Sequence, residues 1–321
     1  MKSFDELSKE FTEKFNTRHF PKEPASLYEP AQYFLNLGGK RIRPVICLMG
    51  NELFDEISPD AYQVAIAIEL FHNFTLIHDD IMDKAPLRRG MQTVHAKYDE
   101  PTALLSGDVM LVTAYDYINQ IKSSHIRRII HLFNKTAKEV CEGQQTDMDF
   151  EKKQQVSLAE YIHMISLKTS VLLAASLRLG AILGGAGERN QELLYEFGKN
   201  LGLAFQVQDD YLDAFGDPTK FGKQTGGDIV SNKKTFLLIK AMESATEKHK
   251  KEMQELIRSN PTDKVERMLS IFKACGVDEE AKALKEKYIQ VAFERLEDIA
   301  VMAIRKKPLR DLAEFLVKRD F

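Results

Sequence analysis

The sequence has few cysteines and no excess of either charge. Its three cysteines, Cys47, Cys141 and Cys275, are far apart and form no CxxC pair. We therefore expect buried, reduced thiols of the kind found in cytosolic proteins. The 45 Lys and Arg residues stand against 48 Asp and Glu residues, for a formal net charge of −3. This balance excludes the strong positive field of a nucleic-acid-binding protein.

Long apolar runs and linkers are also missing. The N-terminus, MKSFDELSKEF, alternates charged and apolar residues and has no signal-peptide core. The longest apolar stretch, 171–187, is interrupted by Arg178 and is too short for a membrane span, so we interpret it as a buried core helix. We expect no membrane span and a cytoplasmic location. Because no Gly/Ser-rich hinge divides the chain, we expect one large domain over residues 1–321.

Strand signals are nearly absent, since β-branched alternation is rare and no Asn-Gly hairpin turn occurs. Helical periodicity is widespread instead. In 279–304 apolar residues recur every three to five positions, and Asp278 is placed to cap the helix. Segments 61–78 and 193–213 are apolar nearly all round, which is typical of helices in the middle of a bundle. The sequence therefore predicts an all-α fold.

Two acidic clusters share one spacing. Asp79, Asp80 and Asp83 form a DDxxD motif, and a second DDxxD follows 130 residues later. The aspartates of the second motif are Asp209, Asp210 and Asp213. Residues four apart on a helix differ by only about 40° in direction, so the first and last aspartate of each motif point the same way. Each motif lies at the end of a strongly apolar helical segment, FHNFTLIHDD or LGLAFQVQDD. Acidic residues of an ordinary solvated surface would not be attached to such segments.

Carboxylates gathered in this way need a counter-charge. Two like charges about 4 Å apart cost roughly 1–4 kcal/mol, depending on the local dielectric. An all-oxygen ligand set favours Mg²⁺ or Mn²⁺ over zinc, and the spacing does not fit an EF-hand loop. One DDxxD alone is a weak signal, because ordinary surface charge produces it. Two of them on apolar helices predict a divalent-metal site.

Basic residues precede the first acidic motif and also follow each of the two motifs. The segment 38–44, GGKRIRP, places three cations after a flexible Gly pair, although it is not a Walker A loop. Arg88 and Arg89 come just after the first DDxxD, and Lys223 and Lys233 come after the second. Each group alone could be a solvated basic turn. Their repetition indicates a diphosphate held between metal ions and cationic side chains.

With these motifs in view, the chain resembles the trans-isoprenyl diphosphate synthases, or polyprenyl synthetases. The motifs that carry the resemblance occur in the family's order: GGKRIRP (38–44), FHNFTLIHDDIMD (71–83), LRRG (87–90), LSGDVML (105–111), LKTS (167–170), FQVQDDYLD (205–213), GKQTGGD (222–228) and NKKT (232–235). They cover most of residues 30–240. The last 80 residues carry helical periodicity but no diagnostic motif.

The resemblance implies an all-helical bundle around a central cavity, usually a homodimer, with the two DDxxD motifs facing each other at the cavity mouth. It implies about three Mg²⁺ ions per site, with Mn²⁺ as an alternative. Asp79, Asp83 and Asp209 would be direct ligands, supported by Asp80, Asp210 and Asp213. The resemblance also assigns substrate-binding residues. Arg88, Lys168, Lys223 and Lys233 would hold the allylic diphosphate, Lys40, Arg43, His72 and Arg89 would hold isopentenyl diphosphate, and Thr169 and Gln206 would lie near the allylic cation.

Residues before the first DDxxD bear on product length. Phe74, Thr75 and Phe71 stand five, four and eight residues before Asp79, which places them roughly 6–12 Å deeper along the helix. A bulky Phe74 would then be a floor for the growing chain, or both phenylalanines simply pack the core. One aromatic at the fifth position with a small residue at the fourth resembles the geranylgeranyl-producing pattern.

The expected reaction joins isopentenyl diphosphate to dimethylallyl, geranyl or farnesyl diphosphate, with a C20 product favoured and a C15 product as the alternative. A terpene cyclase would also ionise an allylic diphosphate, but such enzymes usually pair DDxxD with a differently spaced motif. A non-catalytic synthase subunit usually loses an aspartate cluster, whereas this chain keeps both. We therefore expect an enzyme, a trans-prenyltransferase.

Overall fold

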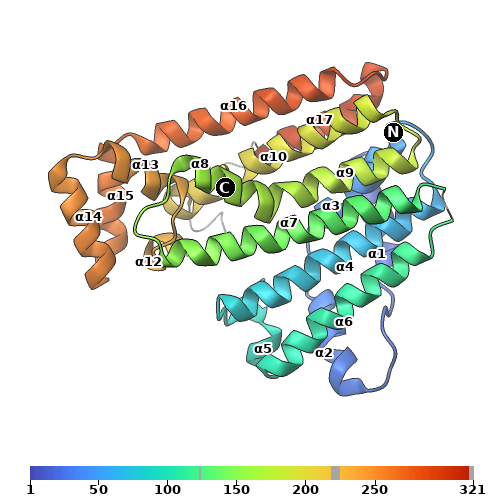
Figure 1. Cartoon of the computed structure of the whole chain (residues 1–321), viewed down its shortest axis with the longest axis horizontal. Coiled ribbons are helices and arrows are strands. Elements are labelled where there is room, and N and C mark those ends of the chain that lie inside the picture. The colour runs from blue at the N-terminus through green and yellow to red at the C-terminus, as the bar shows by residue number, and fades with distance from the viewer. Residues whose placement is uncertain (123, 218–224, 318–321) are drawn as a thin grey trace. The chain divides into compact units, whose positions relative to one another are not determined.

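The structure is a computed structural model that describes residues 1–122, 124–217 and 225–317. Most of these residues are helical (Figure 1), which confirms the predicted all-α class. The chain forms two compact units. The first unit comprises Met1–Asn134, Ala175–Leu194 and Ala300–Leu309, and the second comprises Lys135–Ala174, Tyr195–Ile299 and Arg310–Phe321. The single domain expected from the sequence stays a prediction, and each unit is described by itself below.

Most of the first unit comes from the N-terminal part of the chain. Its elements are α1 (Phe4–Phe15), α2 (Ala25–Asn36), α3 (Ile42–Glu52), α4 (Pro59–Met82), β1 (Leu87–Arg88), β2 (Met91–Gln92), α5 (Val94–Lys97) and α6 (Glu100–Asn119). Helix α4 contacts α3 on one side and α6 on another, as Figure 1 shows. The helices α7 (Ile126–Lys152), α9 (Val171–Leu183), α10 (Glu188–Phe215) and α17 (Ala303–Val317) contribute residues to both units.

Helix α4 carries the first DDxxD motif at its C-terminal end. The side chain of Ser58 caps its N-terminus by accepting a hydrogen bond from Ala61 N–H, and Pro59 occupies a first-turn position where its missing N–H costs nothing. The helix is apolar nearly all round and is buried along most of its length, as the pattern in 61–78 predicted. A 24-residue buried helix thus holds the aspartates on a rigid base.

A short hairpin follows α4, and the sequence did not predict it. Strands β1 and β2 are antiparallel, with Arg88 opposite Met91. The two turn residues, Arg89 and Gly90, have φ of 54° and 76°. Positive φ at both positions is the conformation that two-residue hairpins need, and Arg-Gly supplies it here in place of the usual Asn-Gly. The hairpin fixes the directions of both arginines in the LRRG segment.

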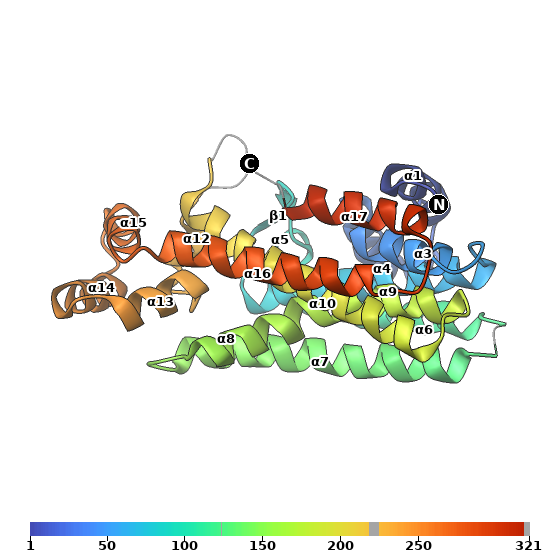
Figure 2. The same ribbon diagram turned by 90° about the horizontal axis from the view of Figure 1, so that it is seen from above.

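The second unit contains α8 (Leu158–Ile165), the π-helical turn η1 (Ser166–Ser170), α12 (Gly227–Val230), α13 (Phe236–Ser244), α14 (Glu247–Ser259), α15 (Lys264–Ala274) and α16 (Val277–Glu297). Helix α15 contacts each of α12, α13, α14 and α16, and Figure 2 shows α13, α14 and α15 gathered together. A hydrophobic core that includes Tyr161, Phe236 and Phe272 joins these elements. The expected Asp278 cap is wrong, because α16 begins at Val277 and Gly276 occupies the cap position with φ of 70°.

Two sequence-based expectations need comment. The three cysteines are free, but only Cys47 is buried, and Cys141 is exposed. The helical stretch Leu158–Leu183 is long enough and apolar enough to cross a membrane, yet 78% of its most apolar window is buried inside the protein. That degree of burial is typical of a core helix, as the sequence indicated for 171–187.

Candidate active site

The loop GGKRIRP is held in place by a buried ion pair. Arg41 has a left-handed backbone conformation, with φ of 51°, and its side chain is buried. Its guanidinium pairs with the buried carboxylate of Glu69 on α4 and stacks 4.6 Å from the ring centroid of Phe15. Asn73 also donates to Glu69, at 3.0 Å. A buried charge of this kind is stable only when paired and hydrogen-bonded, so the contacts fix where the loop enters α3.

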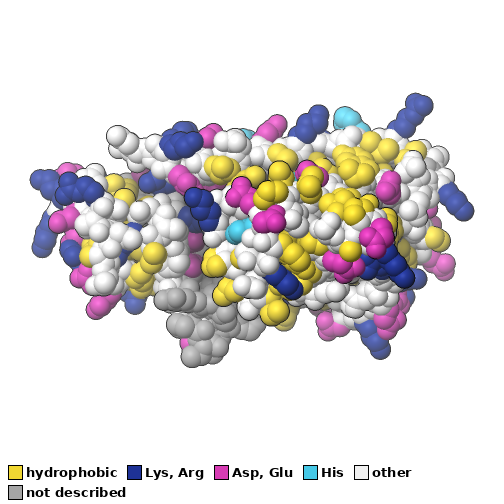
Figure 3. Space-filling model, turned by 90° about the horizontal axis from the view of Figure 1, so that it is seen from below, with side chains coloured by type: hydrophobic (Ala, Val, Ile, Leu, Met, Phe, Trp, Pro, Cys, Tyr) yellow, Lys and Arg dark blue, Asp and Glu magenta, His cyan; other side chains and the backbone are white. Residues whose placement is uncertain are grey.

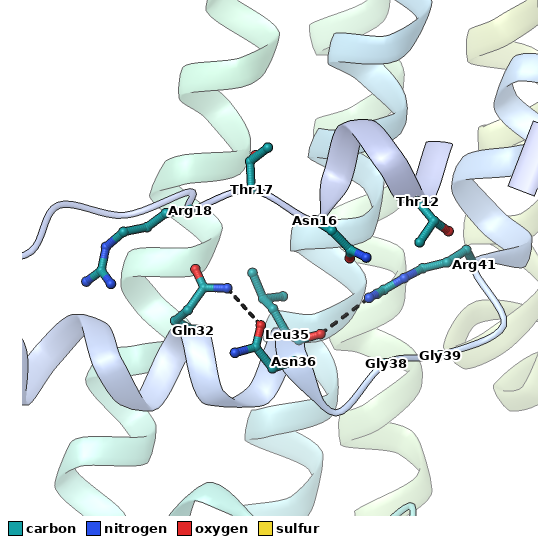
Figure 4. Close-up of a pocket in the computed structure, with 10 residues that line it drawn as sticks. All are labelled: Thr12, Asn16, Thr17, Arg18, Gln32, Leu35, Asn36, Gly38, Gly39 and Arg41. Atoms are coloured by element: carbon teal, nitrogen blue, oxygen red, sulfur yellow. Dashed lines mark hydrogen bonds between the residues drawn. The ribbon is translucent and has the colours of Figure 1, made fainter. Parts of the chain in front are cut away.

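A pocket of about 560 Å³ lies beside this loop and is drawn in Figure 4. Uncharged polar side chains line much of it, including Asn16, which follows α1, and Gln32 and Asn36 of α2. At its edge the Arg41 guanidinium donates to the carbonyl of Leu35, as the dashed line in Figure 4 shows. Arg41 therefore ties α2 to the loop while its neighbours Lys40 and Arg43 carry the remaining cationic groups.

The four residues expected to bind isopentenyl diphosphate lie in the first unit, and contacts show that three of them lie close to one another. Arg43 Nη1 donates to His72 Nε2 at 3.2 Å, so the ring of His72 carries its proton on Nδ1. The Arg89 guanidinium covers Gly39, because a Cβ on that glycine would meet it at 3.0 Å. Burial lowers the pKa of His72 well below its usual value, and the charges of Arg43, Arg89, Arg88 and Arg41 lower it further. Lys40, the fourth, is exposed in the same loop.

This cluster is strongly cationic and buried in part. Arg43 Nε is buried and has no hydrogen-bond acceptor among the residues that the structure describes. Burial also lowers the pKa of Arg43, while Glu69 raises it. A cation with an unused buried donor beside a neutral histidine is suited to an anionic oxygen ligand.

The first DDxxD motif is joined to the hairpin through Arg88. Its Nε lies 2.8 Å from Asp80 Oδ1, its Nη2 lies 2.7 Å from the same oxygen, and Nη2 is 3.6 Å from Asp79 Oδ2. Asp80 is almost fully buried, and desolvation raises its pKa while Arg88 lowers it. This engagement fits the supporting role that the family resemblance gives to Asp80. Asp83 is exposed at the C-cap of α4.

The three residues considered for product length also lie on α4. Phe71 is fully buried, with its ring 5.3 Å from that of Phe133 and 5.7 Å from that of Phe74. Phe74 also contacts the ring of His78 at 4.7 Å. The hydroxyl of Thr75 donates to the backbone carbonyl of His72, as helical threonines often do. Phe71 therefore belongs to the core, and Phe74 is braced on both sides.

In the second unit, the LKTS segment forms the π-helical turn η1 between α8 and α9. Such turns insert one residue into a helix and often occur at functional sites. Lys168 Nζ forms an ion pair with Asp147 at 2.7 Å, and Thr169 Oγ1 donates to Gln206 Oε1 at 3.1 Å. The turn thus directs Lys168 toward α7 and Thr169 toward α10.

The second DDxxD motif continues this network. Gln206 Nε2 and Tyr161 Oη donate to the two oxygens of Asp210, at 3.1 and 2.6 Å, and Phe236 N–H donates at 3.3 Å. Desolvation raises the pKa of Asp210 to about 7, with its hydrogen bonds acting in the opposite direction. Asp210 is therefore held in a buried position by three hydrogen bonds. Asp209 is half-buried beside it.

Asp213 lies next to a carboxylate that the sequence analysis did not single out. Its Oδ2 accepts a hydrogen bond from Asp228 N–H at 3.0 Å, and burial and then the charge of Asp228 raise its pKa. Lys233 Nζ lies 3.7 Å from Asp228 Oδ1. Asp228, Tyr161 and Asp147 are the residues that sequence reasoning missed here. Asp228 ends the quoted GKQTGGD motif, whereas no pattern marked Tyr161 or Asp147. Lys223 lies outside the described residues.

The donor set fits a hard divalent cation. Each DDxxD motif offers carboxylate oxygens one helical turn apart, as the bond from Asp83 N–H to the Asp79 carbonyl shows for α4. Within the described ranges no group of three or more His, Cys, Asp or Glu side chains is arranged to hold a metal ion by itself. A bound Mg²⁺ would then complete its shell with water and phosphate oxygens, which is how Mg²⁺ is usually held.

Comparison with known proteins identifies the family. The family model described as polyprenyl synthetase matches residues 24–275. The chain belongs to the polyprenyl synthetase family. This polyprenyl synthetase is 38% identical to a geranylgeranyl diphosphate synthase of Sulfolobus acidocaldarius over 91% of each chain. It is therefore a prenyltransferase, as its motifs indicated.

Solved structures agree. A crystal structure of a geranylgeranyl pyrophosphate synthase is 44% identical and superimposes with a TM-score of 0.95 over 100% of both chains. A polyprenyl synthase of Caulobacter crescentus, crystallised with calcium and isoprenyl diphosphate, is 26% identical with a TM-score of 0.89 over 100% of both chains. The isoprenoid synthase fold expected from the sequence is thereby confirmed for this polyprenyl synthetase.

Proposed function

We propose that this polyprenyl synthetase is a Mg²⁺-dependent geranylgeranyl diphosphate synthase, which adds isopentenyl diphosphate to allylic diphosphates until the chain reaches C20. The observation that carries the proposal is the 38% and 44% identity to two geranylgeranyl diphosphate synthases over nearly the whole chain. The braced aromatic Phe74, five residues before Asp79, supports the C20 length. Farnesyl diphosphate synthase is the alternative.

In this proposal the first unit binds isopentenyl diphosphate. Lys40, Arg43 and Arg89 bind its phosphate oxygens, with neutral His72 beside them. Support comes from the buried, unused Nε of Arg43 and from the guanidinium of Arg89 over Gly39. A backbone without a Cβ at Gly39 leaves room for Arg89 to approach the same ligand as Arg43. Arginine suits this task because its fork of donors matches phosphate geometry.

Lys168, Lys233 and Lys223 would bind the allylic diphosphate together with Arg88. Bound Mg²⁺, held by Asp79, Asp83 and Asp209, would supply the charge that makes diphosphate a better leaving group. Asp80, Asp210 and Asp213 would orient those ligands, since each of the three already accepts a hydrogen bond from a side chain or a backbone N–H. The lysines would stabilise the negative charge that develops on the leaving diphosphate.

The bond changes follow from this arrangement. The C1–O bond of the allylic substrate breaks, and its electron pair leaves with the diphosphate. The double bond of isopentenyl diphosphate attacks C1, and a proton is then lost from C2 of the new unit to the released pyrophosphate. The Thr169 hydroxyl and the Gln206 amide, fixed against each other at 3.1 Å, would stabilise the cation beside them. Exclusion of water from this part of the site would keep the cation from being quenched.

The direct test is to incubate the purified protein and Mg²⁺ with labelled isopentenyl diphosphate and, separately, dimethylallyl, geranyl or farnesyl diphosphate. We expect a C20 prenyl alcohol on chromatography after phosphatase treatment. A C15 end product would establish the farnesyl alternative, a cyclic hydrocarbon would indicate a terpene cyclase, and no incorporation would refute the enzyme.

Variants test the aspartates. Asp79→Ala and Asp209→Ala should each lower kcat by more than about 100-fold, because metal sites depend strongly on their ligands and supports. Asp149→Ala, at an exposed aspartate of α7, should leave the rate unchanged. Folded Asp79 or Asp209 variants with near-normal activity would refute the metal assignment.

We also propose that the enzyme is a cytoplasmic homodimer.

A further inference from the structure

Lys264, the first residue of α15, lies in the C-terminal part of the chain, where the sequence shows no diagnostic motif. Its side chain is 1% exposed. Its ammonium group donates three hydrogen bonds, to the Val230 carbonyl at 3.2 Å, to Asn232 Oδ1 at 2.6 Å and to Asn260 Oδ1 at 3.0 Å. All three donors of the ammonium group are therefore used, and all three acceptors are uncharged.

A buried position at the start of a helix is unfavourable for a lysine unless its hydrogen bonds offset the cost. A cation at the N-terminus of a helix opposes the helix dipole. Burial removes water from the ammonium group and lowers its pKa, and among the described residues its three acceptors are all uncharged. An uncompensated buried charge of this kind is costly, so the three hydrogen bonds have to offset its desolvation.

Two of the three acceptors, Val230 and Asn232, belong to the segment 226–233, which contains α12 and ends at Lys233, and the third, Asn260, is the C-cap residue of α14. Val230 is the last residue of α12, so Lys264 satisfies a carbonyl that the helix end leaves open. Asn232 adopts φ of 60°, a left-handed conformation that a side-chain contact helps to hold. At the other end of the segment, Gly226, with φ of 84°, lies so close to Val265 that a Cβ would meet Cγ1 at 2.6 Å. The first two residues of α15, Lys264 and Val265, therefore hold segment 226–233 in place.

The seated segment carries groups of the candidate site. Asp228 N–H donates to Asp213, Lys233 Nζ is 3.7 Å from Asp228, and Lys233 N–H donates to the Asp228 carbonyl at 2.9 Å. Movement of α12 or of Asn232 would therefore displace both Lys233 and the partner of Asp213.

We propose that Lys264 is a positioning residue, which clamps segment 226–233 onto α15 so that Lys233 is held ready for the allylic diphosphate. The proposal deepens the proposed function and rests on it for the identity of the ligand. It assigns a specific task in catalysis to the C-terminal helices, through a residue that touches neither substrate nor metal.

The test compares Lys264→Met with Ile271→Val, a substitution at a buried residue of the same helix that makes none of the three hydrogen bonds of Lys264. Lys264→Met should raise KM for farnesyl diphosphate about tenfold, which corresponds to about 1.4 kcal/mol of binding. KM for isopentenyl diphosphate should change less than about twofold, because its proposed residues lie in the other unit. In a Lys233→Met background, Lys264→Met should raise KM for farnesyl diphosphate by less than about a further twofold, because no lysine then remains at position 233 to be held in place.

A second measurement does not depend on activity. Amide hydrogen exchange of a peptide covering 226–235 should become faster in Lys264→Met and stay unchanged in Ile271→Val. Unchanged exchange there, or equal rises of KM for both substrates, would overturn the clamp. Lack of prenyltransferase activity in the wild type would instead overturn the proposed function, and the exchange result would still decide whether Lys264 holds the segment.

Discussion

Buried hydrogen bonds set the positions of single charged residues in each of the two units. Glu69 anchors Arg41, Arg88 engages Asp80, and Tyr161 donates to Asp210. In each case one partner is buried, so the contact excludes water and has a defined geometry. The neighbours in sequence, such as Lys40, Asp79 and Asp209, are thereby presented in fixed directions.

His19 provides a prediction about pH. Its ring donates from Nε2 to the Phe15 carbonyl at 2.8 Å, and its Nδ1 is hydrogen-bonded to Tyr117 Oη, also at 2.8 Å. Burial lowers its pKa. Below about pH 6.5 the unfolded chain takes up a proton more readily than the fold does, so the free energy of unfolding should fall as the pH drops. Urea unfolding between pH 7.5 and 5 measures this.

The control for this measurement is the pair His19→Gln and His131→Gln. The first should weaken the pH dependence below 6.5, and the second, at an exposed histidine of α7, should leave it as in the wild type. A His19→Gln protein with the same pH profile as the wild type would show that another group is responsible.

Phe74 provides a prediction about product length. Replacing it with Ala should open space beneath the growing chain and shift the product beyond C20, as seen by chromatography of the hydrolysed prenyl alcohols. Phe34→Ala, at a fully buried residue of α2, should lower stability without lengthening the product. If Phe74→Ala folds and still releases only C20, the ring is a core residue and not a floor.

At the scale of elements, the π-helical turn η1 depends on two glycines. A Cβ on Gly143 of α7 would lie 2.3 Å from the backbone nitrogen of Lys168. A Cβ on Gly202 of α10 would lie 2.8 Å from the Cα of Ser170. Helices α7 and α10 therefore approach the turn on both sides more closely than any larger residue allows, and they hold Lys168 and Thr169 between them.

Gly143→Ala and Gly202→Ala should each destabilise the protein by about 1–3 kcal/mol, the usual cost of overpacking, because the obstructing atoms are backbone. Both should also lower kcat, since Lys168 and Thr169 must shift. Gly187→Ala is the matched control, as its Cβ would meet nothing within 4 Å. Thermal unfolding and steady-state kinetics provide the two readouts, and unchanged values for both variants would contradict the close-packed turn.

At the scale of the whole molecule, α6 leaves an apolar face exposed. Leu104, Leu105, Val112 and Tyr115 are 37–60% exposed, and at 100° per residue they fall within an arc of about 100°. Figure 3 shows hydrophobic side chains gathered on the face of the molecule seen from below. Exposed apolar patches of this kind often mark subunit interfaces. The face therefore supports the proposed homodimer.

Val112→Glu and Leu105→Glu, combined, should dissociate that dimer, because two carboxylates would be buried at the interface without a partner. Light scattering coupled to gel filtration should report about half the wild-type mass. Ile304→Glu, at another highly exposed apolar residue, should leave the mass unchanged. A wild-type protein that elutes as a monomer would refute the dimer itself.

Much of the candidate site could be predicted from the sequence because its parts are local. A DDxxD spacing puts two carboxylates on one side of a helix wherever that helix lies, and the apolar residues before it mark the helix as buried. The hairpin at Arg89 was missed because Arg-Gly is an unusual turn pair, and its positive φ values are visible only in the backbone. The exposed position of Cys141 was missed because composition does not determine which face of a helix is buried.

The sequence by itself determined the helical class, the two aspartate motifs, the basic segments and the family. These depend on residue types at fixed spacings, which covalent geometry converts directly into directions on a helix. Only the tertiary structure decided that Arg43 meets His72, that Arg88 engages Asp80, that Tyr161 supports Asp210 and that Lys264 seats segment 226–233. Those contacts join residues distant in the chain, and their strength comes from exclusion of water, which no spacing in the sequence records.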